Sequence, residues 1–243
     1  MRFDLITVFP GVVADFGRLG VTGDAVRAGK LSLRGHNLRD FAGDSGRPDD
    51  TPYGGGAGML LQAEPLAQAI EAVRGMAPSK RPVIALGPHG RPFTQVAAQQ
   101  LRDVGGAIVV CGRYEGWDER LNSLVDECFS LGDFIMSGAE LPALCIVDAC
   151  ARLIPGVLGA EDALDSESFV DDLLEFPQYT RPYEWRGQVV PPVLLSGNHA
   201  EIARWRRQQS LGRTFIRRPD LLDNLNLSAD DRALLREFLE SES

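Results

Sequence analysis

Apolar and polar positions follow two kinds of pattern in the first two-thirds of the chain. Short segments that are mostly apolar, or that alternate apolar and polar residues, predict strands at 4–9, 31–38, 81–86 and 107–111. Two segments between these runs, 65–73 and 94–104, predict helices. Strand–helix–strand order with short connections is typical of an α/β fold, in which helices cover a parallel sheet. Ligands bind such sheets beyond the carboxyl ends of the strands.

The last third of the chain has a different pattern. Residues 160–172 are acidic and rich in small side chains, which predicts a flexible linker. Two helical segments follow it, at 199–211 and 229–239. We therefore expect an α/β domain over residues 1–159, the linker over 160–172, and a small, mainly helical domain over 173–243.

Charge is distributed unevenly along the chain. The net charge of −9 argues, taken alone, against nucleic-acid binding. Residues 199–218, however, contain six arginines, Trp205 and a single acidic residue. Composition balances two interpretations of this run, a solvated helix face and a patch that binds phosphates. The arginines are Arg204, Arg206, Arg207, Arg213, Arg217 and Arg218.

The amino terminus and the cysteines favour a cytoplasmic protein. The apolar segment that starts the chain contains Asp4 and predicts a first strand rather than a signal peptide. No apolar run approaches the roughly 18 residues of a membrane span. Cys111, Cys128, Cys145 and Cys150 form no Cys-x-x-Cys pair and lie in apolar surroundings. They are interpreted as buried structural thiols in a reducing compartment.

The segment 131–142 carries the clearest chemical pattern. It contains Gly132 and Gly138 together with the carboxylates of Asp133 and Glu140, and an apolar, helix-periodic run at 146–158 follows it. Glycines let a backbone approach a ligand closely, and a buried loop must satisfy its own polar groups. The segment is therefore predicted to cradle a cofactor.

Three other loops are candidates for binding. The segment 49–59 has four glycines but lacks the Lys-Ser/Thr ending of a phosphate-binding P-loop. The loop that holds His89 offers no second ligand, so no metal site is predicted. Glu115 follows the strand at 107–111, and its carboxylate is interpreted as a ribose or amine acceptor, or as an ion partner of Arg113 or Arg120. None of these loops has the Gly-x-Gly-x-x-Gly pattern of a dinucleotide enzyme.

Taken in order, these segments resemble one family. The chain is similar to the bacterial tRNA (guanine-37-N1)-methyltransferases of the SPOUT class. The resemblance covers nearly the whole chain, and its specificity lies in the series of motifs rather than in any one of them. The matching segments are 3–10, 52–59, 111–120, 132–142, 152–159, 179–182, 190–198 and 217–221.

The resemblance implies a fold, a cofactor and an assembly. The N-terminal domain would thread a trefoil knot, which few proteins contain. The protein would be a homodimer whose active sites each combine the knot of one protomer with the C-terminal domain of the other. The knot loops would bind S-adenosylmethionine through Ala85, Leu86, Gly87, Gly112, Tyr114, Glu115, Leu131, Gly132, Asp133, Phe134, Ile135, Met136, Gly138 and Pro142.

The resemblance also implies how methyl transfer to guanine N1 is catalysed. That nitrogen is weakly acidic, so a general base and a cation near O6 would lower the barrier. Arg152 matches the family's arginine. The family's base is an aspartate, but this chain has Glu167 in that register, with Asp165 as an alternative base. Ala139 stands where the family commonly has a second glycine, which requires a backbone outside the left-handed region.

The implied partner is a tRNA that carries G36 and G37. The six arginines, with Asp49 and Asp50, would contact this RNA. The resemblance leaves open a role for Mg²⁺ in catalysis, although no protein metal site is predicted. Two alternatives remain: another SPOUT methyltransferase that acts on rRNA or on a ribose 2′-OH, and an RNA-binding relative that has lost catalysis.

Overall fold

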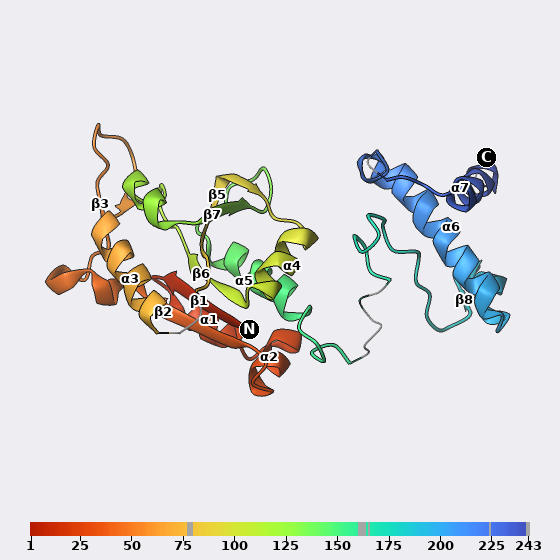
Figure 1. Cartoon of the computed structure of the whole chain (residues 1–243), viewed down its shortest axis with the longest axis horizontal. Helices are drawn as coiled ribbons and strands as arrows, with labels where there is room; N and C mark the ends of the chain where they lie inside the picture. The colour runs from red at the N-terminus through yellow and green to blue at the C-terminus, as the bar shows by residue number, and fades with distance from the viewer. Residues whose placement is uncertain (77–79, 160–163, 165, 224, 242–243) are drawn as a thin grey trace. The chain divides into compact units, whose positions relative to one another are not determined.

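The chain forms two compact units, Met1–Ala160 and Glu161–Ser243 (Figure 1). The computed structural model describes residues 1–76, 80–159, 164, 166–223 and 225–241. No helix among these residues is long and apolar enough to cross a membrane.

The N-terminal unit is built on a five-stranded sheet with the order β2-β1-β6-β5-β7. All of its strand pairs are parallel, as the sequence predicts. The central strand β6 is buried along its whole length, which explains its continuous apolar sequence. The strands are β1 (Arg2–Thr7), β2 (Ser32–Asn37), β5 (Val83–Pro92), β6 (Gly106–Val110) and β7 (Glu127–Ser130).

Five α-helices pack around this sheet. They are α1 (Pro10–Phe16), α2 (Gly20–Arg27), α3 (Ala63–Gly75), α4 (Gln95–Asp103) and α5 (Glu140–Ala151). The apolar face of α3 packs on β1, β5 and β6 in one core cluster that includes Ile6, Ala85 and Ile108. Helix α5 contacts α1, α2 and α4. The Thr94 hydroxyl caps α4 by accepting from the Ala97 amide, so this predicted helix is confirmed.

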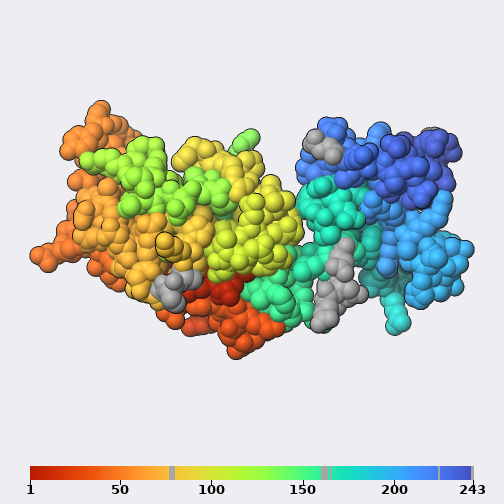
Figure 2. Space-filling model, viewed as in Figure 1, coloured from red at the N-terminus to blue at the C-terminus, as the bar shows by residue number. Residues whose placement is uncertain are grey.

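Short elements connect these strands and helices. Strands β3 (Asp49–Asp50) and β4 (Leu60–Leu61) form a short antiparallel pair. The glycine-rich loop between them projects from the unit (Figures 1 and 2). The 3₁₀ helices of the unit are η1 (Leu38–Phe41), η2 (Gly43–Ser45) and η3 (Glu119–Leu124).

The bounds of α5 differ from the prediction at both ends. The segment expected to be a loop as far as Pro142 already turns helical at Glu140, because a proline is tolerated in a first helical turn. The segment 146–158 was expected to be helical throughout, but α5 ends at Ala151 and tight turns follow it. The helix cannot continue through Pro155, because proline has no amide hydrogen to donate. Arg152 is therefore the residue that caps the carboxyl end of α5.

The C-terminal unit is mainly helical, as expected. Helix α6 (His199–Arg217) packs against α7 (Ala229–Ser241), and both extend beyond their predicted ends. Asn198 caps α6, and its side chain accepts from the Glu201 amide at 3.3 Å. The core of the unit is small and is centred on Leu173, Leu211 and Leu234. The remaining elements are β8 (Glu184–Trp185), β9 (Gln188–Val189), η4 (Pro192–Leu195) and η5 (Pro219–Leu221).

Part of the predicted linker is hydrogen-bonded within the C-terminal unit. The Phe169 amide donates to the Leu173 carbonyl at 2.7 Å, and Asp171 pairs with an arginine of α6. Residues 160–163 and 165 of this segment, including the alternative base Asp165, lie outside the described residues.

The cysteines divide into two groups. Cys111 and Cys150 are buried, and burial raises the pKa of the Cys150 thiol to about 12. Cys128 is half-buried and Cys145 is exposed on α5. The prediction of buried thiols is therefore wrong for Cys145, whose apolar sequence neighbours point to a different side of the helix.

A buried carboxylate on β1 connects side chains from three segments of the sheet. Asp4 on β1 is fully buried and accepts from His36 on β2 at 2.8 Å, from Arg2 at 2.7 Å and from Arg81, just before β5, at 2.6 Å. Burial alone raises the pKa of Asp4, but the hydrogen bonds from His36, Arg2 and Arg81 outweigh it and hold this pKa well below its usual value. The pairing therefore stabilises the folded protein while Asp4 is ionised.

Replacing Asp4 is expected to destabilise the protein in a pH-dependent way. Asp4→Asn leaves buried cations without a counter-charge, so the free energy of unfolding at neutral pH should fall by roughly 3–5 kcal/mol. The contribution is complete above the unfolded-state pKa of about 3.9 and is lost as the pH falls toward the lower folded-state value. The difference between the two proteins should therefore begin to shrink near pH 4 and should continue to shrink as the pH falls further. Urea titrations at several pH values measure this difference.

Asp15→Asn is a suitable control for this experiment, because the Asp15–Arg18 pair is exposed. Equal midpoints for Asp4→Asn and Asp15→Asn at neutral pH would contradict the role assigned to Asp4.

Candidate cofactor and catalytic site

A cavity of the N-terminal unit lies beside the irregular middle of β5 and beyond the ends of β6 and β7. It has a volume of about 480 Å³, within the range of small-molecule pockets. Residues 86–89 of β5, the loops that follow β6 and β7, and the start of α5 provide its walls. The lining residues are Leu86, Gly87, Pro88, His89, Gly112, Arg113, Tyr114, Glu115, Gly116, Trp117, Glu119, Phe129, Ser130, Leu131, Gly132, Phe134, Ile135, Met136, Gly138, Ala139 and Pro142.

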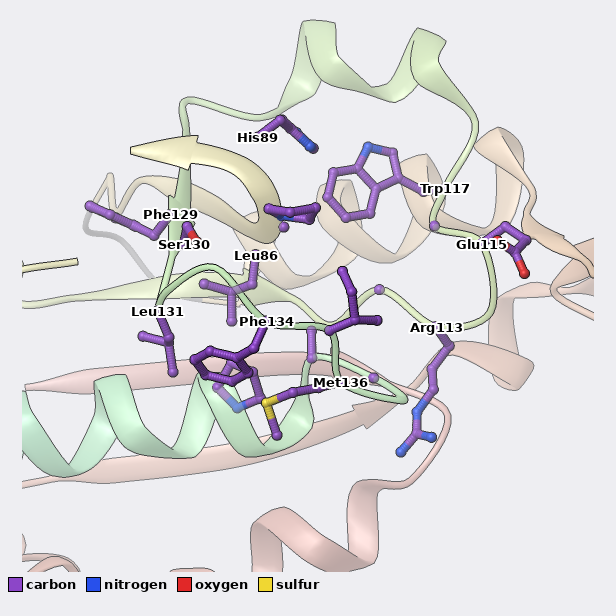
Figure 3. A pocket seen from close by; sticks show the side chains of 18 of the residues that line it. Leu86, His89, Arg113, Glu115, Trp117, Phe129, Ser130, Leu131, Phe134 and Met136 are labelled. Carbon is purple, nitrogen blue, oxygen red and sulfur yellow. The ribbon is translucent and has the colours of Figure 1, made fainter. Parts of the chain in front are cut away.

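The walls of the cavity are largely apolar and aromatic. Figure 3 shows Trp117 and His89 on one side of the space, Phe134 with Met136 on the other, and Leu86 between them. The His89 and Trp117 rings are tilted toward each other, with centroids 6.0 Å apart. Such surfaces suit a flat, partly apolar ligand, while the polar backbone groups of the loops supply orientation.

Glycine is required at two places on the cavity wall. Gly132 has φ +148°, and a Cβ there would crowd the Phe134 ring. A Cβ on Gly112 would fall 2.9 Å from the Trp117 ring. A larger residue at either glycine position would therefore push the Phe134 or Trp117 ring out of its place in the cavity wall.

Most of the cofactor residues predicted from the sequence meet at this cavity, but two do not line it. Ala85 is fully buried inside β5, where it pairs with Val110 and Cys128. Asp133 is exposed and lies outside the lining. Ala139 has φ −91°, outside the left-handed region, so the condition set for a methyl group at this position is confirmed.

Several lining residues were missed by sequence reasoning. His89 was considered only as a metal ligand, and Phe129 and Ser130 belong to β7, a strand that the sequence did not predict. Trp117 lies in a segment that was noted only for its tyrosine and glutamate. The sequence did offer a signal for His89, because this residue follows the strand predicted at 81–86 and ligands bind beyond the carboxyl ends of such strands.

Glu115 lines the cavity beside the glycine-rich loop. Its amide donates to the Met59 carbonyl at 3.0 Å, and a Cβ on Gly58 would overlap the Glu115 side chain. The two ion partners considered for Glu115 are engaged elsewhere, Arg113 with Glu140 at 2.9 Å and Arg120 with Asp118 at 2.6 Å. The structure thus favours the interpretation of Glu115 as a ligand acceptor.

The two residues predicted to perform the chemistry lie on different units. Arg152 is half-buried at the carboxyl end of α5. Glu167 is half-buried in the C-terminal unit, where it lines a small cavity of about 170 Å³. Arg206, Arg207 and Asp171 line the same cavity, so charges of both signs lie near this carboxylate.

The arginines of α6 are less available than the sequence suggests. Arg204 pairs with Glu237 at 2.6 Å, and Arg207 pairs with Asp231 at 2.9 Å. Arg218, just beyond the helix, pairs with Asp220 at 2.6 Å. Arg206 stacks on Phe176, and Arg213 donates to a backbone carbonyl. Acidic residues therefore pair with half of the predicted patch, and the partners of Arg204 and Arg207 are distant in sequence.

The other predicted RNA contacts, Asp49 and Asp50, form β3 at the base of the projecting loop. Asp50 is exposed, and its carboxylate accepts from the Thr51 amide at 2.7 Å. Within the described part of the chain, no group of three or more His, Cys, Asp or Glu residues is arranged to hold a metal ion.

Comparison with known proteins places the chain in one family. A family model described as tRNA (Guanine-1)-methyltransferase TrmD matches residues 1–224. A tRNA (guanine-N(1)-)-methyltransferase of Syntrophotalea carbinolica is 52% identical over 239 residues, which cover 98% of this chain and 96% of the relative. A protein of the same name from Streptococcus pyogenes is 46% identical over 241 residues, covering 99% and 98%. The chain belongs to the tRNA (guanine-N(1)-)-methyltransferase family.

Proposed function

We propose that the protein transfers a methyl group from S-adenosylmethionine to N1 of guanine 37 in tRNA. The observation that carries this proposal is the cavity beside the middle of β5 and the ends of β6 and β7, in a chain that belongs to this family along nearly its whole length. The position in the tRNA, the methyl donor and the residues involved are parts of the proposal.

The cavity fits the proposed cofactor by size and by chemistry. Its volume of about 480 Å³ suits a nucleoside with an amino-acid side arm. Leu86, Trp117 and Phe134 offer apolar surfaces to an adenine ring, and Glu115 offers a carboxylate to a cationic group. Bound there, S-adenosylmethionine would supply an electrophilic methyl group attached to a sulfonium.

The chain's own residues would handle the proton and the charge. Guanine N1 is protonated at neutral pH and must lose its proton before it can accept a methyl group. Glu167 would take this proton as a general base, and Arg152 would stabilise the negative charge that develops on O6. The extra methylene of a glutamate, relative to aspartate, lengthens the reach of the base by about 1 Å.

The proposal includes a trefoil knot and a homodimer. Two loops that a knot would bring together are bridged directly, since the Ala139 amide donates to the Gly112 carbonyl at 2.9 Å. Large apolar side chains beside the cavity support a dimer, because Phe134 is 58% exposed, Ile135 84% and Leu141 58%. Exposed apolar surface of this kind is typical of protein interfaces.

The substrate assignment is tested with two tRNAs that differ in one base. With labelled S-adenosylmethionine, the protein should methylate a tRNA carrying G36 and G37 and leave the otherwise identical tRNA with A37 unlabelled, because adenine lacks the O6 that Arg152 would bind. Scintillation counting of the recovered RNA gives the readout. Labelling of both RNAs, or of neither, would rule out the assignment.

The general base is tested by substitution. Glu167→Gln keeps the size of the side chain but cannot accept a proton at neutral pH, so kcat should fall by about 10²–10⁴. Affinity for S-adenosylhomocysteine, measured by calorimetry, should stay unchanged, because Glu167 lies on the other unit from the cavity.

Glu175→Gln is a matched control in the same unit and should retain activity. If Asp165→Asn abolishes turnover while Glu167→Gln does not, the base is Asp165 and the register assumed for Glu167 is wrong.

The remaining basic surface of α6 is tested by salt dependence. Arg217 is exposed at the end of α6, whereas Arg204 is paired with Glu237. Arg217→Gln should weaken tRNA binding and reduce the slope of log affinity against log salt by about 1. Arg204→Gln should change that slope less. Equal effects of the two substitutions would show that ion pairing within the unit does not determine which arginines contact phosphates.

A further inference from the structure

A buried carboxylate that the proposed chemistry does not use lies beside the cavity. Glu140, the first residue of α5, is 2% exposed. Its carboxylate accepts from the Thr7 hydroxyl at 2.7 Å and pairs with Arg113 at 2.9 Å. A charge buried this deeply is tolerated only when it is paired and hydrogen-bonded, so these contacts are needed to keep Glu140 in place.

Arg113 connects this carboxylate to the cavity wall. It lies between Gly112 and Tyr114, which line the cavity, yet its side chain points away from Leu86, Trp117 and Phe134 (Figure 3). The guanidinium pairs with Glu140, donates to the Ser137 carbonyl at 3.2 Å and lies 4.5 Å from the centre of the Phe9 ring. Arg113 therefore links the loop that follows β6 to the loop that follows β7, on the side that faces away from the cavity.

The same two loops touch along their backbones. Arg113 and Gly138 form an isolated antiparallel bridge, and the Ala139 amide donates to the Gly112 carbonyl at 2.9 Å. A Cβ on Gly138 would overlap the Arg113 side chain. The loops 112–117 and 131–138 form walls of the cavity, so this contact sets the distance between the walls.

Thr7 fastens the arrangement to the sheet. It is the last residue of β1 and is fully buried. Its hydroxyl donates to Glu140 and accepts from the Phe9 amide at 3.0 Å. Thr7 therefore fixes the position of Glu140 relative to β1, and Glu140 in turn fixes the position of the Arg113 side chain.

We propose that Glu140 is a positioning residue for cofactor binding, which acts through Arg113 and Thr7 to fix the spacing of the two loops. This inference rests on the proposed function, because it takes the cavity to be the cofactor site. It assigns to Glu140 no contact with the cofactor. A merely structural role would lower stability without a matching effect on affinity for the cofactor.

The test measures binding and stability separately. In calorimetric titrations of the full-length protein with S-adenosylhomocysteine, Glu140→Gln should raise Kd at least tenfold, because Arg113 loses its counter-charge. Asp103→Asn, which breaks the exposed Arg102–Asp103 pair, should leave Kd unchanged. Thermal melts of the same samples give the change in stability. A wild-type Kd for Glu140→Gln would overturn the proposal.

A second pair of variants covers the case in which Glu140→Gln does not fold. Thr7→Val removes the hydroxyl with little change in shape and should weaken binding several-fold. Thr7→Ser keeps the hydroxyl and should restore the wild-type Kd. Equal Kd values for Thr7→Val and wild type would overturn the proposal.

The coupling between the two charged residues gives an independent readout. In a double-mutant cycle, Arg113→Gln combined with Glu140→Gln should weaken binding no more than the stronger single substitution, because both remove the same interaction. Additive losses would contradict the proposal. Failure of the wild-type protein to bind S-adenosylhomocysteine would instead overturn the cofactor assignment itself, and this inference with it.

Discussion

The parallel pairing of β5 with both β6 and β7 determines where the cavity forms. Ala85 pairs with Val110 on one side, and Leu86 pairs with Phe129 on the other. Strands β6 and β7 end beside these pairs, while β5 continues to Pro92 through an irregular segment between Leu86 and Arg91. Three segments of the chain therefore crowd into a small space. Backbone groups in such crowded loops have few partners in the sheet, and they bond to one another instead, as the Ala139 amide does with the Gly112 carbonyl.

Charge at the site is arranged by tertiary pairing rather than by local sequence. Arg113 is adjacent in the chain to Tyr114 and close to Glu115, but it pairs with Glu140, 27 residues away. Likewise, Arg207 in the basic run pairs with Asp231 of α7, and this contact raises the pKa of the Arg207 guanidinium. A count of charges along the chain therefore overstates the positive potential of α6 and gives no indication of the charge pair behind the cavity.

The sequence predicted the elements whose pattern depends on burial alone. Strand β6 and helix α4 were found because a buried strand is apolar throughout and a capped helix begins at a residue such as Thr94. Strand β7 was missed, since Glu127 and Cys128 interrupt its apolar pattern at the edge of the sheet. The glycines at 87, 112, 132 and 138 correctly indicated most of the segments that line the cavity.

The residues missed at the cavity share a physical reason. His89 reaches it because β5 and β7 change register between Leu86 and Arg91, an irregularity that no local pattern shows. The role of Glu140 was also hidden, because a carboxylate in a glycine-rich segment suggests a ligand contact. Only the packing of α5 against β1 shows that this carboxylate faces Thr7.

The two halves of the proposed reaction would draw on different units of the chain. On the cofactor side, Glu140 is 2% exposed and is held by two hydrogen bonds from side chains of separate segments. On the base side, Glu167 is half-buried in a small cavity that Arg206, Arg207 and Asp171 also line, in a unit with a small core. In the proposed reaction the pocket would hold the methyl donor in one position. The base would come from the unit that also carries the arginines of α6, so a guanine would meet its base in the same unit that binds its RNA.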